Sequence, residues 1–244
     1  MSIVLWDIDG TLVRGKGGRV SVNAFTRALR QVSHLQEQLT YPENAAGMTD
    51  RGIALQALAA ASVDETQAQA ILNEFSVAYL VEMEADKHKL LADLLVLPGV
   101  PQALQALHSR GVTQSLLTGN LKPIAELKLG LVDLAEYLDF EIGAFGSDHH
   151  DRNCLVPYVR ERVAQKFGQA PRPGEIVVVG DTPRDIACAR AGDARVIAVC
   201  TGNSSREELL EHKPDALLED LRDTDTVVRT ILRYSSYSDP ALIV

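Results

Sequence analysis

Long apolar runs are missing from this sequence: no stretch reaches the roughly 20 residues that a membrane-spanning helix needs. The chain also begins directly with a short apolar segment, without the basic region and longer apolar region of a secretion signal. Its three cysteines, Cys154, Cys188 and Cys200, are far apart, odd in number and in no zinc-binding pattern. We therefore expect a cytoplasmic protein with no membrane partner, and neither a zinc-binding module nor a disulfide-rich secreted domain.

Positive charge is also in short supply. Lysine and arginine number 24 against 33 aspartates and glutamates, for a formal net charge of −9, so no nucleic-acid partner is expected. An acidic chain can still bind phosphate, because the local field and a bound metal matter more than the total charge. The 244 residues, 46% of them hydrophobic, suffice for one large domain or two smaller ones. The oligomeric state stays open.

Two acidic motifs follow short apolar runs. The sequence DIDGT at 7–11 comes directly after the run 3–6, and GDTPRD at 180–185 comes directly after the run 176–179. Short apolar runs bounded by glycine and turn residues are typical of buried parallel strands. Open α/β sheets bind their ligands at the carboxyl ends of such strands. The two motifs are therefore expected to meet at one edge of a sheet.

Four carboxylates would meet there, and they belong to Asp7, Asp9, Asp181 and Asp185. They would repel one another without a positive charge between them, and a hard divalent cation such as Mg²⁺ supplies it. Each motif alone says little, because Asp-x-Asp and Gly-Asp-x-x-x-Asp occur in many solvated loops. Together, on two strand ends, they favour phosphoryl chemistry.

A third motif lies between these two along the chain. Thr118-Gly119-Asn120 closes another apolar run, 112–117. A threonine hydroxyl and free backbone amides at the start of a helix can hold phosphate oxygens. The alternative is that Thr118 merely caps the following helix.

The remaining sequence predicts a helical segment followed by alternating strands and helices. From residue 21 to about 95 the pattern is almost entirely helical: Ser21 can cap a helix over 22–32, Thr49 a helix to 61, and Asp64 begins a long one to 83. Further strands are expected at 112–117, 140–145, 195–199 and 216–218, and further helices at 101–110, 121–129, 155–167, 183–191, 206–212 and up to about 233.

This order of elements predicts an α/β fold. Alternating strands and helices favour a Rossmann-like, doubly wound parallel sheet with helices on both faces. The helical segment is expected to be a cap domain inserted into that core. We place the core at residues 1–14 and 95–244 and the cap at 15–94.

With these motifs the chain resembles the haloacid dehalogenase-like hydrolase superfamily, and within it the phosphoglycolate-phosphatase-like branch with a helical cap. The motif at 7–11 matches the first family motif specifically, 180–185 matches the fourth well, and Thr118-Gly119-Asn120 matches the shorter second. The resemblance implies a magnesium-dependent hydrolase that removes phosphate from a small phosphorylated metabolite.

The resemblance also implies roles for the acidic residues. Asp7 would be the nucleophile that becomes an aspartyl phosphate, and Asp9 would protonate the leaving oxygen and then activate water. Magnesium would be held by Asp7, by the backbone carbonyl of Asp9 and by Asp181, with Asp185 bound directly or through one water. A dehalogenase lacks the second carboxylate, so Asp9 favours phosphatases and phosphomutases.

The second motif would bind the substrate. Thr118 and the amides near Gly119 would hold phosphate oxygens, and Asn120 would shape the loop. Val13 to Arg19 form a glycine-rich basic stretch. It is either a flexible turn or a flap that brings Arg14, and with it Lys16 and Arg19, to an anion.

The third family motif, usually a lysine before a helix, is not obvious here. Arg152 precedes the helix expected at 155–167, and Lys122 follows the second motif. We prefer Arg152, which would bind as a bidentate clamp where lysine is a point charge. Alternatively, Arg152 pairs with Asp148 or Asp151, and Lys122 reaches the phosphate.

Two other functions remain open at this point. One is a phosphomutase such as a β-phosphoglucomutase-like enzyme, which also carries Asp-x-Asp and would move phosphate within a sugar. The other is a catalytically idle binding module on the same scaffold, supported by the uncertain third motif. Magnesium-dependent turnover of a generic aryl phosphate would separate an enzyme from an idle module.

Overall fold

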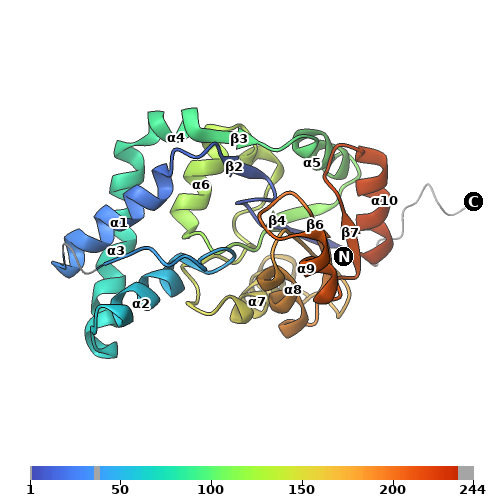
Figure 1. The fold of residues 1–244 in the computed structure, drawn as a ribbon. Helices are drawn as coiled ribbons and strands as arrows, with labels where there is room; N and C mark the ends of the chain where they lie inside the picture. The colour runs from blue at the N-terminus through green and yellow to red at the C-terminus, as the bar shows by residue number, and fades with distance from the viewer. Residues whose placement is uncertain (1, 36–38, 236–244) are drawn as a thin grey trace, which may run out of the picture.

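A five-stranded parallel sheet forms the centre of the protein in the computed structural model, which describes residues 2–35 and 39–235 (Figure 1). The strand order is β4-β1-β5-β6-β7. The strands are β1 (Ile3–Trp6), β4 (Thr113–Leu116), β5 (Ile176–Gly180), β6 (Arg195–Val199) and β7 (Ala216–Leu218). Those at 3–6, 176–180, 195–199 and 216–218 lie where the sequence predicts them.

The register of β1 brings the three sequence motifs together. Trp6 is paired with Leu116 of β4 on one side and with Val179 of β5 on the other. Because parallel strands in register end at the same level, the residues that follow each strand share one edge of the sheet. Asp7 therefore lies between the second-motif loop and the loop that carries Asp181.

Helices cover both faces of the sheet, as the α/β prediction requires. Alternate residues of β1 point into two separate cores: Val4 and Trp6 into one, Ile3 and Leu5 into the other. The first core is shared with α5 (Val100–His108), α6 (Lys122–Leu131) and α10 (Thr224–Tyr234). The second is shared with α7 (Leu155–Phe167), α8 (Pro183–Ala191) and α9 (Arg206–Glu211). The doubly wound fold is confirmed.

The helices of the segment before residue 95, which the sequence predicts to be almost entirely helical, gather on one side of this sheet (Figure 1). They are α1 (Val20–Ser33), α2 (Asp50–Ala60), α3 (Glu65–Ala85) and α4 (Lys87–Asp93). Phe25 of α1 makes edge-on contacts with Phe75 and Tyr79 of α3 and with Tyr41. The short strands β2 (Val13–Gly15) and β3 (Leu94–Val96) pair antiparallel where the chain enters and leaves this helical part.

Two of the three predicted N-terminal helix caps are confirmed and one is wrong. Thr49 and Asp64 cap α2 and α3 by accepting hydrogen bonds from backbone amides, as expected. Ser21 does not cap α1, which already begins at Val20 after Arg19 in a left-handed conformation. The helix expected at 121–129 runs from Lys122 to Leu131, so Gly130, which follows the expected end, lies inside it.

The strand predicted at 140–145 is wrong. That segment forms turns, and a single bridge joins Ala144 to Leu117. Gly143 packs so closely on Ser115 and Leu116 that a side chain there would force them apart. The apolar side chains Phe140 and Phe145 stack on each other, so they contribute to the core without strand pairing. The pair β2 and β3 and the short helices at 135–137 and 152–154 were not expected from the sequence.

Candidate active site

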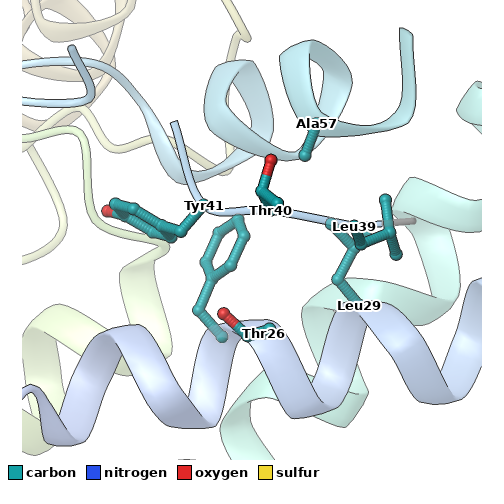
Figure 2. A pocket seen from close by; sticks show the side chains of 7 residues that line it. Thr26, Leu29, Leu39, Thr40, Tyr41 and Ala57 are labelled. Carbon is teal, nitrogen blue, oxygen red and sulfur yellow. The ribbon is translucent and has the colours of Figure 1, made fainter. Parts of the chain in front are cut away.

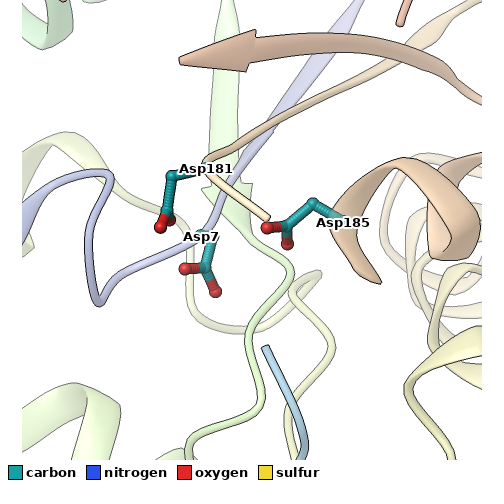
Figure 3. A group of neighbouring side chains, drawn as sticks. All are labelled: Asp7, Asp181 and Asp185. Atoms are coloured by element: carbon teal, nitrogen blue, oxygen red, sulfur yellow. The ribbon is translucent and has the colours of Figure 1, made fainter. Parts of the chain in front are cut away.

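Three buried carboxylates meet at the carboxyl edge of the sheet (Figure 3). Asp7 follows β1, Asp181 follows β5, and Asp185 lies in the first turn of α8. One oxygen from each lies within 4.8 Å of the other two. The sequence grouping of these residues therefore corresponds to a real cluster in space.

The charges of this cluster are not balanced by the protein. Burial raises the pKa of Asp7 to about 7, against the influence of Arg152. Burial, together with Asp7 and Asp185, raises the pKa of Asp181 to about 8. Such shifts mean that the ionised carboxylates repel one another in a poorly solvated place. The donor set consists of hard oxygen ligands and fits a divalent cation such as Mg²⁺.

Arg152 lies against this cluster. It is 5% exposed, and its Nη2 donates to Asp7 Oδ1 at 2.7 Å, to Asp185 Oδ1, and to the backbone oxygen of Leu117 at 3.2 Å. Its Nη1 donates to the backbone oxygen of Gly47 at 3.0 Å. Asp185 and Asp7 raise the pKa of Arg152 although burial opposes them, so the guanidinium stays charged. Asp148, which the sequence offered as an alternative partner for Arg152, pairs with Arg162.

Asp185 is tied down by its neighbours as well as by Arg152. Its Oδ2 accepts from the Thr182 amide at 2.9 Å and from the Thr182 hydroxyl at 2.7 Å, and Thr182 in turn caps α8. Both carboxylate oxygens therefore already hold protein donors. Asp185 is better placed to orient Arg152 than to give a free oxygen to a metal.

Asp181 sits in a narrow slot. Its Oδ1 accepts from the Thr11 hydroxyl at 2.9 Å. A Cβ at Gly10 or at Gly202 would overlap the Asp181 carboxylate, and Gly10 also has a φ of +93°. These two glycines let the backbone close around the carboxylate and fix its direction. A Cβ at Gly180 would instead meet Asp185.

The second-motif loop is pressed against the helical part of the chain. Thr118 is fully buried, and a Cβ at Gly119 would overlap the backbone oxygen of Met48. The Asp50 amide donates to the Gly119 oxygen at 2.8 Å, and the Leu121 amide donates to Asp50 Oδ2 at 2.8 Å. The start of α2 is thus bonded to the loop that is expected to hold phosphate.

The Asp9 side chain has other hydrogen-bond partners than the Asp7 side chain. Its half-exposed side chain accepts from Lys128 Nζ at 2.8 and 2.7 Å and from Asn120 Nδ2 at 2.7 Å. Lys128 Nζ also donates to Asn120 Oδ1 at 2.8 Å, which closes a triangle of three side chains. Burial raises the pKa of Asp9, but Lys128 and Asn120 outweigh it and leave that pKa below its ordinary value.

Lys128 was missed from the sequence. A signal was present, because Ile124, Ala125, Lys128 and Leu129 form the buried stripe of α6. A lysine four residues after a buried isoleucine points to the same side of a helix. Lysine is rarely buried without a partner, so its position on that stripe indicated an internal carboxylate.

Two residues that were expected to touch substrate lie elsewhere in this structure. Lys122 Nζ is 3.9 Å from Glu126 Oε1 and lies over the Phe145 ring. Arg14 donates to the backbone oxygen of Thr201. Neither side chain is therefore placed at the carboxylates. Other residues that the sequence grouped together do lie together. Asp7, Asp181, Asp185 and Arg152 surround one point, and Asp9, Thr118 and Asn120 lie beside them.

A small apolar crevice opens between α1 and α2 (Figure 2). Its walls include Phe25, Leu29, Leu39 and Ala57, and it is too narrow to admit a water molecule. One wall residue, Tyr41, is close enough to Asp50 and Asp9 for their charges, after burial, to raise its pKa. Among the residues that the structure describes, no helix is long and apolar enough to span a bilayer.

Known proteins share both the sequence pattern and the fold. The phosphoglycolate phosphatase of Pseudomonas fluorescens is 23% identical over 222 residues, which cover 90% of this chain and 77% of that protein. A hydrolase from Pseudomonas syringae superposes with a TM-score of 0.63 at 20% identity, covering 94% of this chain and 98% of that one. The β-phosphoglucomutase of Clostridium difficile superposes with a TM-score of 0.65 at 15% identity, covering 97% and 99%.

At these sequence identities, the likeness to the two solved structures supports the fold alone. The family model of the haloacid dehalogenase-like hydrolases, however, matches residues 1–193, which contain every motif discussed above. The resemblance read from the motifs is thereby confirmed, and this chain belongs to the haloacid dehalogenase-like hydrolases.

Proposed function

We propose that this protein is a magnesium-dependent phosphomonoester hydrolase that forms an aspartyl-phosphate intermediate. The observation that carries the proposal is the contact between Arg152 and Asp7 inside a cluster of three buried carboxylates. A fixed cation beside a nucleophile and a metal-binding donor set are what phosphoryl transfer needs. The family and the phosphatase-named relative support the same activity.

Asp7 and Asp181 would hold the metal directly. Among the described residues, one oxygen of each accepts a side-chain hydrogen bond, from Arg152 and Thr11 respectively, and the other oxygen accepts none. The Asp9 carbonyl would be a third ligand, and Asp185 would act through water or through Arg152. When bound, the ion would neutralise charge on the phosphoryl group and on the carboxylates around it.

Asp7 would then attack phosphorus while Arg152 holds one carboxylate oxygen in a fixed direction. The phosphorus–oxygen bond to the leaving group breaks, and Asp7 carries the phosphoryl group as an acyl phosphate. Thr118 and the amides near Gly119 would bind the phosphoryl oxygens. Asp9 is ionised in the free protein, so it would first take up a proton from water as the negative charge of the phosphate enters the site and raises its pKa. It would give that proton to the leaving oxygen and later take one from the water that releases inorganic phosphate.

The substrate is proposed to be a small phosphorylated metabolite. The helical part, placed at residues 15–94, would act as a cap over the site, since its α2 is bonded to the second-motif loop through Asp50. A cap held this close would favour small leaving groups. Phosphoglycolate is the first candidate, because the relative from Pseudomonas fluorescens is named for it.

The test is a phosphate-release screen with purified protein. Glycolate, sugar, amino-acid and nucleotide monophosphates and p-nitrophenyl phosphate would be offered with Mg²⁺, with excess chelator, and with Ca²⁺. We expect release with Mg²⁺, none with chelator and little with Ca²⁺, whose larger and looser coordination shell misplaces the nucleophile. Full activity in chelator would overturn the metal assignment.

The same screen decides between the alternatives. A phosphomutase would convert a sugar phosphate to its isomer and depend on a bisphosphate, with little phosphate released. An idle binding module would release none. The uncertain third motif was the sole support for the idle module, and the position of Arg152 against Asp7 now weighs against it.

A further inference from the structure

A second buried cation serves the second carboxylate of the Asp-x-Asp motif. Lys128 lies on α6, outside every family motif named above, and its side chain is 4% exposed. All three hydrogens of its ammonium group have acceptors, namely the two oxygens of Asp9 and Asn120 Oδ1. We propose that Lys128 is a positioning residue for catalysis: with Asn120 it holds the Asp9 side chain in the direction from which it serves the leaving group. This inference rests on the proposed function.

The geometry favours a positioning role for Lys128, because without it the Asp9 side chain would be loosely held. Its side chain is half exposed, and the contacts that fix it come from Lys128 and from Asn120 Nδ2. Asn120 is itself held by Thr118 Oγ1 at 3.1 Å. The three hydrogen bonds to Asp9 thus come from two fixed elements, the second-motif loop and α6, and a carboxylate bonded from both sides has one favoured rotamer.

Stability is a poor explanation for a lysine in this place. Removing an ammonium group from water is costly, and replacing a buried ion pair by apolar side chains often leaves stability unchanged or higher. Methionine has nearly the same length and could occupy the buried stripe of α6 beside Ile124 and Leu129. Asp9 would not become an orphaned buried charge, because half of its side chain already meets solvent. A lysine that adds little stability is more readily explained by what it does to Asp9.

The experiment uses leaving groups of different quality. A nitrophenolate leaves without a proton, whereas an alkoxide needs one, so misplacing a general acid harms alkyl phosphates more than p-nitrophenyl phosphate. The ratio kcat/KM reports the step in which the leaving group departs. For Lys128→Met we expect kcat/KM on the fastest alkyl phosphate of the screen to fall about a hundred-fold, and on p-nitrophenyl phosphate less than about fivefold.

Further variants test the same proposal and control for unspecific effects. Asp9→Asn should show the same contrast between substrates, and adding Lys128→Met to Asp9→Asn should cost nothing more, because both changes remove one function. Lys166→Met is the matched control, since that lysine makes two surface ion pairs with Asp139 and Glu141 and should leave both substrates unaffected. Equal losses on both substrates, or additive losses in the double variant, would overturn the proposal.

A crystal structure of Lys128→Met tests the same idea without turnover. We expect the Asp9 carboxylate to leave Asn120 and occupy other rotamers, while the variant stays folded and loses only the stability that the hydrogen bond from Lys128 to Asn120 Oδ1 provided. An unmoved Asp9 would contradict the proposal. If Lys128→Met does not fold, Lys128→Gln takes its place, and failure of both to fold would show a stabilising role and end the proposal. If the wild type releases no phosphate, the proposed function fails, and this structural comparison still decides the positioning role.

Discussion

Asp7 and Asp9 are two residues apart, yet their surroundings are opposite. Around Asp7 lie three buried carboxylates, two of which, Asp7 and Asp185, pair with Arg152, and burial raises the pKa of Asp7 to about 7 and of Asp181 to about 8. Around Asp9, one half-exposed carboxylate has its own ammonium and an amide, and these lower its pKa.

The difference fits the two chemical roles proposed above for Asp7 and Asp9. The Asp7 side has an excess of negative charge and therefore demands another cation. The Asp9 side is already neutralised by the protein and needs none. A metal is thus expected to bind on the Asp7 side, and proton transfer is left to the Asp9 side. The following changes should break or sharpen this contrast.

Asp7→Asn should have the largest effect. An amide cannot attack phosphorus, so we expect kcat to fall on the order of ten-thousand-fold or more, as when other enzymes lose a nucleophile. Circular dichroism and the melting temperature should show an intact fold, because removing one of three repelling carboxylates relieves the cluster. Turnover near the wild-type rate in a cleanly purified variant would remove Asp7 as the nucleophile.

Arg152→Ala should come next. Loss of a preorganised charge beside the nucleophile is expected to lower kcat about a hundred- to a thousand-fold. Arg152→Lys should recover part of this, because one ammonium cannot reproduce contacts to Asp7, Asp185 and the Gly47 oxygen. Steady-state kinetics of the two variants would show the order. Lysine restoring full activity would mean that a point charge suffices.

The binding of Mg²⁺ should strengthen as pH rises from about 6 to 8. With pKa values near 7 and 8, Asp7 and Asp181 hold protons at the lower pH and must release them to bind the ion. Calorimetry in buffers of different ionisation heat should therefore detect proton release when the ion binds. Without metal, the raised pKa values mean that folding stability falls as pH increases through this window, since ionised carboxylates repel. Binding that is equally tight at both pH values would contradict the charge imbalance.

Asp50→Asn tests the bond between α2 and the second-motif loop. Burial raises the pKa of Asp50 to about 7, although the Leu121 amide opposes the shift. A raised acid pKa lowers folding stability progressively above the unfolded value of 3.8 and fully above about 7. Asparagine keeps an acceptor for Leu121 and removes this penalty. The melting temperature of Asp50→Asn relative to wild type should therefore increase from pH 5 to pH 8.

Asp50→Ala is the companion change. It leaves the buried Leu121 amide without its partner, which should cost about 1–3 kcal/mol of unfolding free energy. KM is expected to rise more than kcat falls, because the cap contact shapes the site without joining the chemistry. A variant as stable as the wild type in urea titration would show that the Leu121 amide finds another acceptor.

Lys122→Ala should have the smallest effect. Its ammonium interacts with Glu126 and the Phe145 ring, away from the carboxylates. Activity within about twofold of the wild type and a stability change within about 0.5 kcal/mol are expected for an exposed pair. A loss comparable with that of Arg152→Ala would make Lys122 the cation of the third motif.

The sequence predicted the Asp7 side well, and for a physical reason. Continuous apolar runs identified β1 and β5, and parallel register then forces Asp7 and Asp181 to the same edge. Arg152 followed from the family resemblance, because it precedes α7 at about the place of the family's lysine, and α7 begins and ends where expected. The steps that place Asp7 and Asp181 depend on local pattern and strand pairing, and the step that selects Arg152 depends on the resemblance.

The Asp9 side depends on contacts between distant segments. Lys128 is buried in a helix on which α3 and α4 pack, and no pattern within α6 shows that its charge meets Asp9, which lies far from it in the sequence. Arg14 turns to the Thr201 oxygen for a similar reason, since the loop after β6 lies beside it only in the folded chain. The segment expected as a strand at 140–145 forms turns, and there Gly143 packs directly on β4.

Locating the phosphoryl group on the protein tests the central claim most directly. Asp9→Asn should slow hydrolysis of the intermediate, so the variant can be mixed with p-nitrophenyl phosphate and Mg²⁺, quenched in acid and digested for mass spectrometry. We predict one phosphoryl group per chain, on the peptide that contains Asp7 and assigned to that residue, and none when Asp7→Asn is added. Continued turnover with no phosphorylated peptide, or with the phosphoryl group on another residue, would contradict the division of roles between Asp7 and Asp9.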